Sequence, residues 1–336
     1  MVNTLTLPEG FIARSAALDD AENVADLFKI YSLAIAGVED INAEETRNSW
    51  QSPGFNPDTD IRLVFTTDGQ LAAYVEVWVN SELPVHPFIW ACVHPDFMGK
   101  GLGTYITNWG EQRCRQVIDI LPTDLRLAAR VASFSTNQPA RHLFEELNWS
   151  HIRSYYTMRI DMVSAPPMPV WSEGIELRPY TSENLRAVYS AHREAFRDHF
   201  GHVEESFESE LERFKHNLED NPQHDPSLWF IAWDGNEIAG YCLCRSASPS
   251  DHEAGYINIL GVRRPWRKHG LGLAFLQHAF GEFHRRGQMH VELGVDANSL
   301  TGALRLYEKA GMYIHYQNDM FEKELRPGRE VAVESL

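Results

Sequence analysis

The sequence predicts an α/β protein with mixed strands, built as two similar domains that are each a twisted sheet with helices on both faces. The chain has 336 residues and 43% hydrophobic content, which is enough to fill two cores. A proline-rich stretch, residues 164–170, cannot sustain a helix or a central strand and suits a semi-rigid connector. We therefore expect domains at 1–163 and 173–327, a linker at 164–172 and a tail at 328–336.

The same order of elements is expected on both sides of this connector, as in the internal duplication of a long unit. Each half opens with a short strand and an amphipathic helix, and continues with two apolar runs around an Asp-Gly pair, which is typical of a hairpin. An apolar strand then leads into a glycine-rich loop and a helix. The strands and helices expected after the hairpin are 88–93, 125–131, 139–147 and 154–160 in the first half, and 256–262, 290–295, 302–309 and 319–324 in the second.

Charge and cysteine content limit the class of protein. The net charge of -17 argues against a nucleic-acid partner, and it suits a cationic acceptor or simply keeps the protein in solution. No apolar run approaches the length of a bilayer span and residues 1–15 lack a signal-peptide layout, so we expect a cytoplasmic protein without a membrane partner. Cys242 and Cys244 would share one strand face, and together with Cys92 and Cys114 they are expected to be reduced core thiols.

The loop from Arg267 to Gly272 carries the clearest chemical signal. Gly270 and Gly272 lack a β-carbon, so backbone N–H groups can approach an anion where a helix begins with its partial positive charge. Such a loop suits a phosphate or diphosphate, although the spacing matches neither a P-loop nor a dinucleotide fingerprint. Glycines at a helix start also form ordinary turns, and it is the apolar strand before the loop, with Asn298 and Tyr307 after it, that favours a binding function.

Residues 262–272, 295–298 and 303–312 together resemble the acyl-CoA-binding core of the GNAT superfamily of acetyltransferases. Because the first half contains a weaker copy of the same pattern, the whole chain resembles a tandem GNAT protein. The specific motifs lie mostly in the second half. The resemblance implies that acetyl-CoA is the cosubstrate.

The resemblance also implies which residues contact this cosubstrate. The strand before the loop would pair its backbone with the pantetheine arm as an added strand does, and the loop would wrap the diphosphate. The implied cofactor-binding residues are Leu260, Gly261, Val262, Arg267, Lys268, His269, Gly270, Leu271, Gly272 and Asn298.

Two tyrosines are the candidate catalytic residues. Tyr307 matches the family's helix tyrosine, which implies a general acid for the departing thiolate, although a half-buried packing tyrosine would fit the same position. Tyr256 stands where one tandem member of the family has a strand glutamate, so the general base is open. Glu253, a water chain or a backbone carbonyl could serve, while Tyr256 positions the substrate or a water, or is an ordinary strand aromatic.

The first half is expected to be noncatalytic. Phe144 stands at the position of Tyr307 and has no proton to donate, and Met98 stands at the position of Arg267. Backbone N–H groups could still hold an acyl-CoA there. The residues of this possible second cofactor site are Val93, Gly99, Gly101 and Gly103.

A group of histidines, His192, His199 and His202, lies between the first two helices of the second half. Gly201 interrupts the segment and no metal-binding motif is present, so we expect solvated or substrate-facing histidines and no metal. The acidic stretch 204–212 is interpreted as a solvated helix face or as an attractant for a cationic amine.

These observations predict an N-acetyltransferase that transfers the acetyl group of acetyl-CoA to a primary amine of a small molecule, with the chemistry in the second half. We expect a monomer or homodimer. One alternative is a noncatalytic acyl-CoA-binding sensor or scaffold. Another is a protein or peptide N-acetyltransferase.

Overall fold

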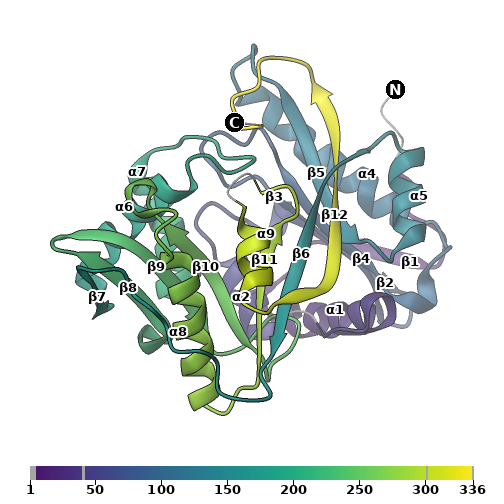
Figure 1. Cartoon of the computed structure of the whole chain (residues 1–336). Helices are drawn as coiled ribbons and strands as arrows, with labels where there is room; N and C mark the ends of the chain where they lie inside the picture. The colour runs from purple at the N-terminus through teal and green to yellow at the C-terminus, as the bar shows by residue number, and fades with distance from the viewer. Residues whose placement is uncertain (1–4, 40–41, 300–301, 335–336) are drawn as a thin grey trace. The chain divides into compact units, whose positions relative to one another are not determined.

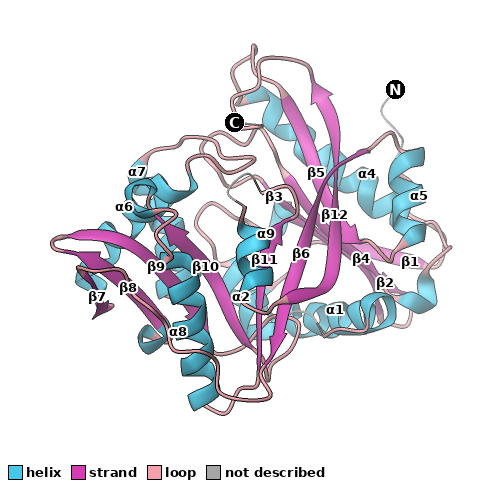
Figure 2. Ribbon diagram, viewed as in Figure 1, coloured by secondary structure: helices cyan, strands magenta, loops and turns pink. Residues whose placement is uncertain are grey.

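The computed structural model describes residues 5–39, 42–299 and 302–334, which form two compact units (Figure 1). Both units are α/β, with a mixed sheet and helices, as the sequence predicts (Figure 2). Unit 1 comprises Met1–Ser154, Val203–Ser209 and Asn318–Val331. Unit 2 comprises Tyr155–His202, Glu210–Gln317 and Ala332–Leu336.

Unit 1 has the strand order β1-β2-β3-β4-β5-β12. Its strands are β1 (Phe11–Arg14), β2 (Ile61–Thr66), β3 (Leu71–Trp78), β4 (Phe88–Val93), β5 (Leu127–Phe134) and residues 318–326 of β12 (Tyr313–Arg326). Its α-helices are α1 (Ala21–Ala36), α2 (Ala43–Trp50), α3 (Pro57–Asp60), α4 (Leu102–Arg115) and α5 (Gln138–Glu146). Short 3-10 turns lie at Leu18–Asp20, Pro95–Phe97 and Gln116–Asp119.

Helices cover both faces of the unit 1 sheet. On one face the ring of Phe28 in α1 packs edge-on against Tyr74 of β3, with ring centroids 5.5 Å apart. On the other face Gly110 of α4 lies so close to Ile89 of β4 that an added β-carbon would come within 3.0 Å of that side chain. The sheet therefore has two buried faces, which explains why its central strands are almost continuously apolar.

Unit 2 has the strand order β6-β11-β10-β9-β8-β7. Its strands are residues 155–161 of β6 (Ser150–Asp161), β7 (Ile175–Pro179), β8 (Trp229–Asp234), β9 (Glu237–Arg245), β10 (Gly255–Val262) and β11 (His290–Asp296). Its α-helices are α6 (Leu185–Phe196), α7 (Phe207–Phe214), of which residues 210–214 lie in this unit, α8 (Leu271–Arg285) and α9 (Ala303–Lys309). Short turns lie at Ser182–Asn184, Lys215–Glu219, Pro226–Leu228 and Arg264–Trp266.

The two faces of the unit 2 sheet are covered by different helices. Tyr241 of β9 points toward α6, where its hydroxyl lies 3.0 Å from Nδ1 of His192. Gly240, the preceding residue, faces α8, since an added β-carbon would come within 3.0 Å of Phe275. In Figure 1 α8 runs across β9 and β10, and the apolar core of the unit lies beneath it. The face under α6 and the face under α8 are named the α6 face and the α8 face below.

The last strand of each half of the sequence lies in the sheet of the other unit. Residues 155–161 of β6 pair antiparallel with β11, and residues 318–326 of β12 pair antiparallel with β5. The compact units thus do not coincide with the expected ranges 1–163 and 173–327. The strands that accept them, β11 and β5, each pair in parallel with a neighbour on their other side. Because the two accepting edges are of the same kind, their backbones alone do not determine which strand is added.

Two expectations about local structure are confirmed. Residues 164–172 contain no helix or strand. All four cysteines are free and buried, and the sulfurs of Cys242 and Cys244 lie 3.6 Å apart on one face of β9. None of the helices in residues 5–39, 42–299 and 302–334 has the length and apolar character that a membrane span requires.

Candidate active site

Strands β10 and β11 separate part-way along their length. They pair in parallel only from Gly255 to Ile257 of β10 and from Val291 to Leu293 of β11. Beyond this point β10 continues on β9 and β11 continues on β6. The backbone of Leu260–Val262 therefore has one edge that pairs with no described strand, and such an edge can accept an extended, amide-bearing ligand.

A β-bulge lies where the two strands begin to separate. In the pairing of β10 with β9, Ile257 faces Cys244 and Ile259 faces Leu243, so Asn258 has no counterpart. A bulge changes the direction of its strand and leaves one residue outside the hydrogen-bond ladder. The end of β10 is thereby turned away from β11.

The loop after β10 leads directly to the start of α8. Lys268 has a φ of +66° and Gly270, the N-cap of α8, has a φ of +84°, so two residues of the loop have the left-handed backbone conformation. The N-cap has no side chain to satisfy the first N–H groups of the helix. These groups and the partial positive charge of the helix start make the loop suitable for an anion such as a diphosphate.

Other residues of the loop have structural contacts that the sequence did not reveal. The guanidinium of Arg267 donates to the carbonyl of Val262 at 3.0 Å and to that of Ala195 at 2.9 Å, and thus fixes the loop between β10 and α6. The carbonyl of His269 accepts a bond from the Ser172 hydroxyl at 2.9 Å. Gly272 allows α8 to approach α9, because an added β-carbon would lie 2.9 Å from Leu306.

Tyr307 lies in the core on the α8 face. It is 8% exposed and belongs to the apolar cluster beneath α8. Burial raises the pKa of its hydroxyl well above the usual value, and the nearby Cys242 adds to the shift. The hydroxyl therefore carries its proton at neutral pH, as a proton donor must.

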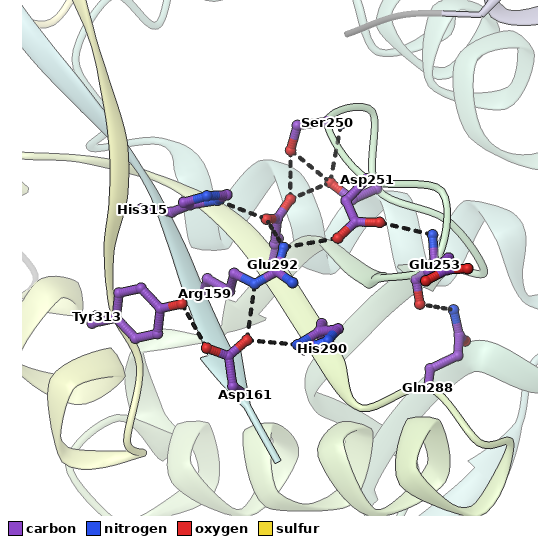
Figure 3. Close-up of polar contacts among 11 residues, drawn as sticks. Arg159, Asp161, Ser250, Asp251, Glu253, Gln288, His290, Glu292, Tyr313 and His315 are labelled. Atoms are coloured by element: carbon purple, nitrogen blue, oxygen red, sulfur yellow. Dashed lines mark hydrogen bonds and ion pairs between the residues drawn. The ribbon is translucent and has the colours of Figure 1, made fainter. Parts of the chain in front are cut away.

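Tyr256 lies on the opposite face from Tyr307. It pairs in register with Glu292 of β11, and its hydroxyl lies 3.6 Å from the point where a β-carbon on Gly294 would be. Gly294 itself is exposed. Glu253 is placed differently: it is exposed in the loop before β10, where its backbone N–H bonds to Asp251 and its carbonyl accepts from Gln288 (Figure 3).

Asn298 does not lie at the start of a helix. It is exposed in the turn after β11, where its N–H bonds to the carboxylate of Asp296, whereas α9 begins at Ala303. The matching residue of unit 1, Asn137, is the N-cap of α5 and accepts a bond from the N–H of Ala140. The contact of Asn298 with a cofactor stays a prediction.

The expected histidine group is partly buried. Nδ1 of His192 faces the hydroxyl of Tyr241 at 3.0 Å, and its ring stacks on Phe196. Burial, followed by the charges of His199 and His202, lowers the pKa of His192 to about 4. His192 thus lies within α6 rather than between two helices, and it is a neutral packing residue that faces the sheet rather than a solvated one.

A network around Glu292 was not found by sequence reasoning. Glu292 is fully buried on β11 and is surrounded by Arg159 of β6, His315 of β12, and Ser248 and Ser250 of the loop before β10 (Figure 3). The signal in the sequence was a glutamate in the middle of an otherwise apolar strand, Val291 to Val295.

The profile of the acetyltransferase (GNAT) family matches residues 26–149 and again residues 185–312. The chain belongs to the GNAT family. It is therefore an acyltransferase with two GNAT domains, and members of this family use acyl-CoA as the acyl donor.

Relatives and solved structures agree with this assignment. A mycothiol acetyltransferase of Streptomyces scabiei is 25% identical over 260 residues, which cover 77% of this chain and 78% of the relative. One from Thermobispora bispora is 27% identical over 223 residues, covering 65% and 70%. The crystal structure of a GCN5-related N-acetyltransferase from Sphaerobacter thermophilus has a TM-score of 0.80 at 34% identity and covers 97% of this chain and 99% of that one. A tandem GNAT protein of clavulanic acid biosynthesis, with a TM-score of 0.67 at 14% identity over 95% and 100%, shows the tandem fold alone.

The GNAT fold of unit 1 has the same kind of strand separation. Strand β4 pairs with β5 only at Phe88 and Ile89, and Val93 lies at its far end. Gly99 and Gly101 have φ values of +74° and +82°, and Gly101 is the N-cap of α4. An added β-carbon on Gly103 would lie 3.0 Å from Leu143, much as one on Gly272 would lie 2.9 Å from Leu306. At the position of Tyr307, Phe144 packs against Phe321 with ring centroids 5.0 Å apart.

Proposed function

We propose that this GNAT protein transfers the acetyl group of acetyl-CoA to a primary amine of a small molecule, and that unit 2 is the catalytic unit. The observation that carries the proposal is the separation of β10 from β11, followed by a loop to the start of α8, where the N-cap Gly270 has no capping side chain. An unpaired strand edge suits the amides of a pantetheine arm, and the helix start suits its diphosphate.

The acyl donor would lie along Leu260, Gly261 and Val262 and end at the loop. In this arrangement the N–H groups of Lys268, His269, Gly270 and Leu271 surround the diphosphate, while Arg267 and Gly272 hold the loop and helix in place. Asn298 would contact the same donor from the turn after β11. The corresponding backbone positions of unit 1, Val93, Gly99, Gly101 and Gly103, form a possible second cofactor site.

Tyr307 is the proposed general acid. Attack of a neutral amine on the thioester carbon breaks the C–S bond, and the sulfur that leaves requires a proton. The buried hydroxyl of Tyr307 keeps its proton at neutral pH and can supply it. Tyr256, on the α6 face beside the exposed Gly294, is proposed to orient the acceptor.

A small acceptor is supported by the name of the relatives, mycothiol acetyltransferase, which implies a small-molecule substrate in those proteins. The net charge of -17 also favours a cationic amine over a polyanionic partner. A peptide acceptor is the second candidate, and the shared GNAT family is its only support.

Release of free CoA thiol from acetyl-CoA, measured against small primary amines and against peptides with a free N-terminus, tests the proposal. We expect turnover with members of the first group. Turnover with the peptides alone would move the acceptor to the second candidate. Binding of acetyl-CoA without turnover in any mixture would contradict acetyl transfer to an amine.

A further inference from the structure

A row of polar side chains crosses the α6 face of the unit 2 sheet. Tyr256 of β10 pairs in register with Glu292 of β11, and Glu292 pairs in register with Arg159 of β6. Nδ1 of His315, from β12, reaches the same carboxylate at 2.9 Å (Figure 3). We call Tyr256, Glu292, Arg159 and His315 the polar row.

The carboxylate of Glu292 is fully occupied. One oxygen accepts bonds from the hydroxyls of Ser248 at 2.6 Å and Ser250 at 2.5 Å. The other accepts from Nη1 of Arg159 at 3.0 Å and from His315 at 2.9 Å. A buried carboxylate with four donors is an acceptor only, so Glu292 cannot itself take a proton from a substrate without losing one of these bonds.

The second ring nitrogen of His315, Nε2, can act as a proton acceptor. Because Glu292 only accepts, Nδ1 of His315 must carry the hydrogen, and a neutral imidazole then has its lone pair on Nε2. Within residues 5–39, 42–299 and 302–334, its contacts are Glu292 and the ring of Tyr316, and neither uses Nε2. The side chain is 29% exposed, so a ligand or water can reach this nitrogen.

We infer that His315 is the general base of the acetyl transfer and that Glu292 is the residue that positions it. The inference rests on the proposed function. Nε2 takes the proton of the attacking amine, directly or through one water, as the N–C bond forms. Tyr307 gives its proton to the sulfur as the C–S bond breaks, and solvent then restores both groups.

The two faces of the sheet give this assignment its geometry. Tyr307 lies in the core on the α8 face, whereas His315 and Glu292 belong to the α6 face, where Tyr256 and the exposed Gly294 also lie. The separation of β10 and β11 begins directly after Ile257 and Leu293, next to this row. An acceptor on the α6 face would thus meet the base, while the leaving sulfur would be on the side of the acid.

Further charged and titratable groups near the row include Asp251, which accepts a bond from Arg159 at 2.8 Å, and Asp161, His290 and Tyr313. Asp161 accepts bonds from Arg159 at 2.9 Å, from Nδ1 of His290 at 2.6 Å and from the hydroxyl of Tyr313 at 2.7 Å. His290 is therefore also a histidine held by a carboxylate, but it lies two residues before Glu292, farther from the strand separation. This makes His290 a matched control.

The test compares His315→Gln with His290→Gln. For an alkylamine acceptor we expect His315→Gln to lower kcat/KM by roughly 100-fold, because a positioned base contributes about this much, while its affinity for acetyl-CoA stays within about twofold. His290→Gln should keep kcat/KM within about threefold. A weakly basic aromatic amine, which is neutral throughout the pH range, should also lose turnover in His315→Gln, because it too gives up an N–H proton as the N–C bond forms.

The pH profile separates a base from a packing residue. With the weakly basic amine, the acidic limb of the wild-type profile reflects titration of a group on the enzyme and not of the amine. His315→Gln should lack that limb, and Glu292→Gln should shift it. An acidic limb that stays unchanged in His315→Gln would overturn the inference. If His315→Gln does not fold, recovery of His315→Ala turnover by added imidazole supports the base, and absence of recovery in folded His315→Ala overturns it. A wild-type protein without any amine acetylation would instead reject the proposed function.

Discussion

Units 1 and 2 share a backbone arrangement but differ in the side chain at the position of Tyr307. In both, a parallel strand pair separates after two or three residues, and a glycine in a left-handed conformation begins the next helix. In unit 2 a bulge at Asn258 accompanies the separation, and Tyr307 lies in the core on the α8 face. In unit 1 the register of β3 and β4 runs without a shift, and Phe144 takes the place of the tyrosine. The strand separation and the buried tyrosine are thus separable features of this fold.

The same comparison extends to a buried tyrosine that faces α1 in unit 1 and α6 in unit 2. Tyr241 in unit 2 meets a neutral histidine, His192. Tyr74 in unit 1 donates to the carboxylate of Glu76 and accepts from the indole of Trp50. The buried tyrosines of the two units therefore have partners, His192 and Glu76, whose contributions to stability change with pH in opposite directions.

Replacement of Tyr307 by Phe should have the largest effect, since it gives unit 2 the side chain that unit 1 already has. We expect kcat to fall roughly 10²- to 10³-fold, because a general acid contributes on this order, with acetyl-CoA affinity nearly unchanged. Steady-state release of CoA thiol and calorimetric titration with acetyl-CoA measure the two quantities.

Phe144→Tyr in unit 1 is the control for this change, and it should leave turnover unaltered. A Tyr307→Phe protein that keeps most of its kcat would show that Tyr307 is a packing residue. The leading difference between the two units would then be the bulge at Asn258 rather than the hydroxyl.

Acidification should affect the two units differently. Burial lowers the pKa of His192 to about 4, whereas an unfolded histidine titrates near 6.5. Between these values the unfolded chain binds a proton that the folded chain does not, so this site loses stability as pH falls, by at most about 3 kcal/mol. Burial raises the pKa of Glu76, so that site has the opposite sign: its contribution is present in acid and is lost as pH rises through the raised value.

Thermal unfolding of the wild type and of His192→Phe between pH 7 and pH 4.5 tests this sign. Phe keeps the stacking on Phe196 and removes the titration, so the variant should lose less stability on acidification than the wild type. Parallel slopes in the two proteins would mean that His192 is not the group responsible.

Gly261→Ala should lower the stability of unit 2, although unit 1 has a residue with a side chain at the equivalent position. Gly261 pairs in register with Tyr241, and an added β-carbon would overlap the tyrosine hydroxyl, which is buried and faces His192. Overpacking of this kind costs about 1–3 kcal/mol in the free energy of unfolding. The equivalent position of unit 1, opposite Tyr74, is Cys92.

Chemical denaturation of Gly261→Ala and of the double variant with Tyr241→Phe measures this cost. Removal of the hydroxyl should restore part of the stability, and Cys92→Ala should change it little. Additive losses in the double variant would show that the overlap is not the cause.

The sequence was sufficient to predict local features and insufficient for pairings between distant segments. The loop before α8, the Asp-Gly hairpins and the buried cysteines follow from residue types at short spacing. The exchange of β6 and β12 does not, because two similar strands could close either sheet. The network around Glu292 could not be predicted, because its partners come from three other segments of the chain.

The smallest expected effect concerns Lys268, which has a φ of +66° where unit 1 has Gly99 at +74°. Lys268→Gly removes a left-handed strain of about 1 kcal/mol, but glycine's extra freedom in the unfolded chain offsets much of it, so stability should rise by less than about 1 kcal/mol. Acetyl-CoA affinity should fall only about two- to fivefold, and less at high salt, if the backbone N–H groups hold the diphosphate. Lys268→Asn provides the control, because asparagine tolerates this conformation and is also uncharged. If both variants lose affinity by more than about tenfold at low salt, the charge of Lys268 rather than the backbone holds the diphosphate, and the loops of units 1 and 2 would differ in binding as well as in catalysis.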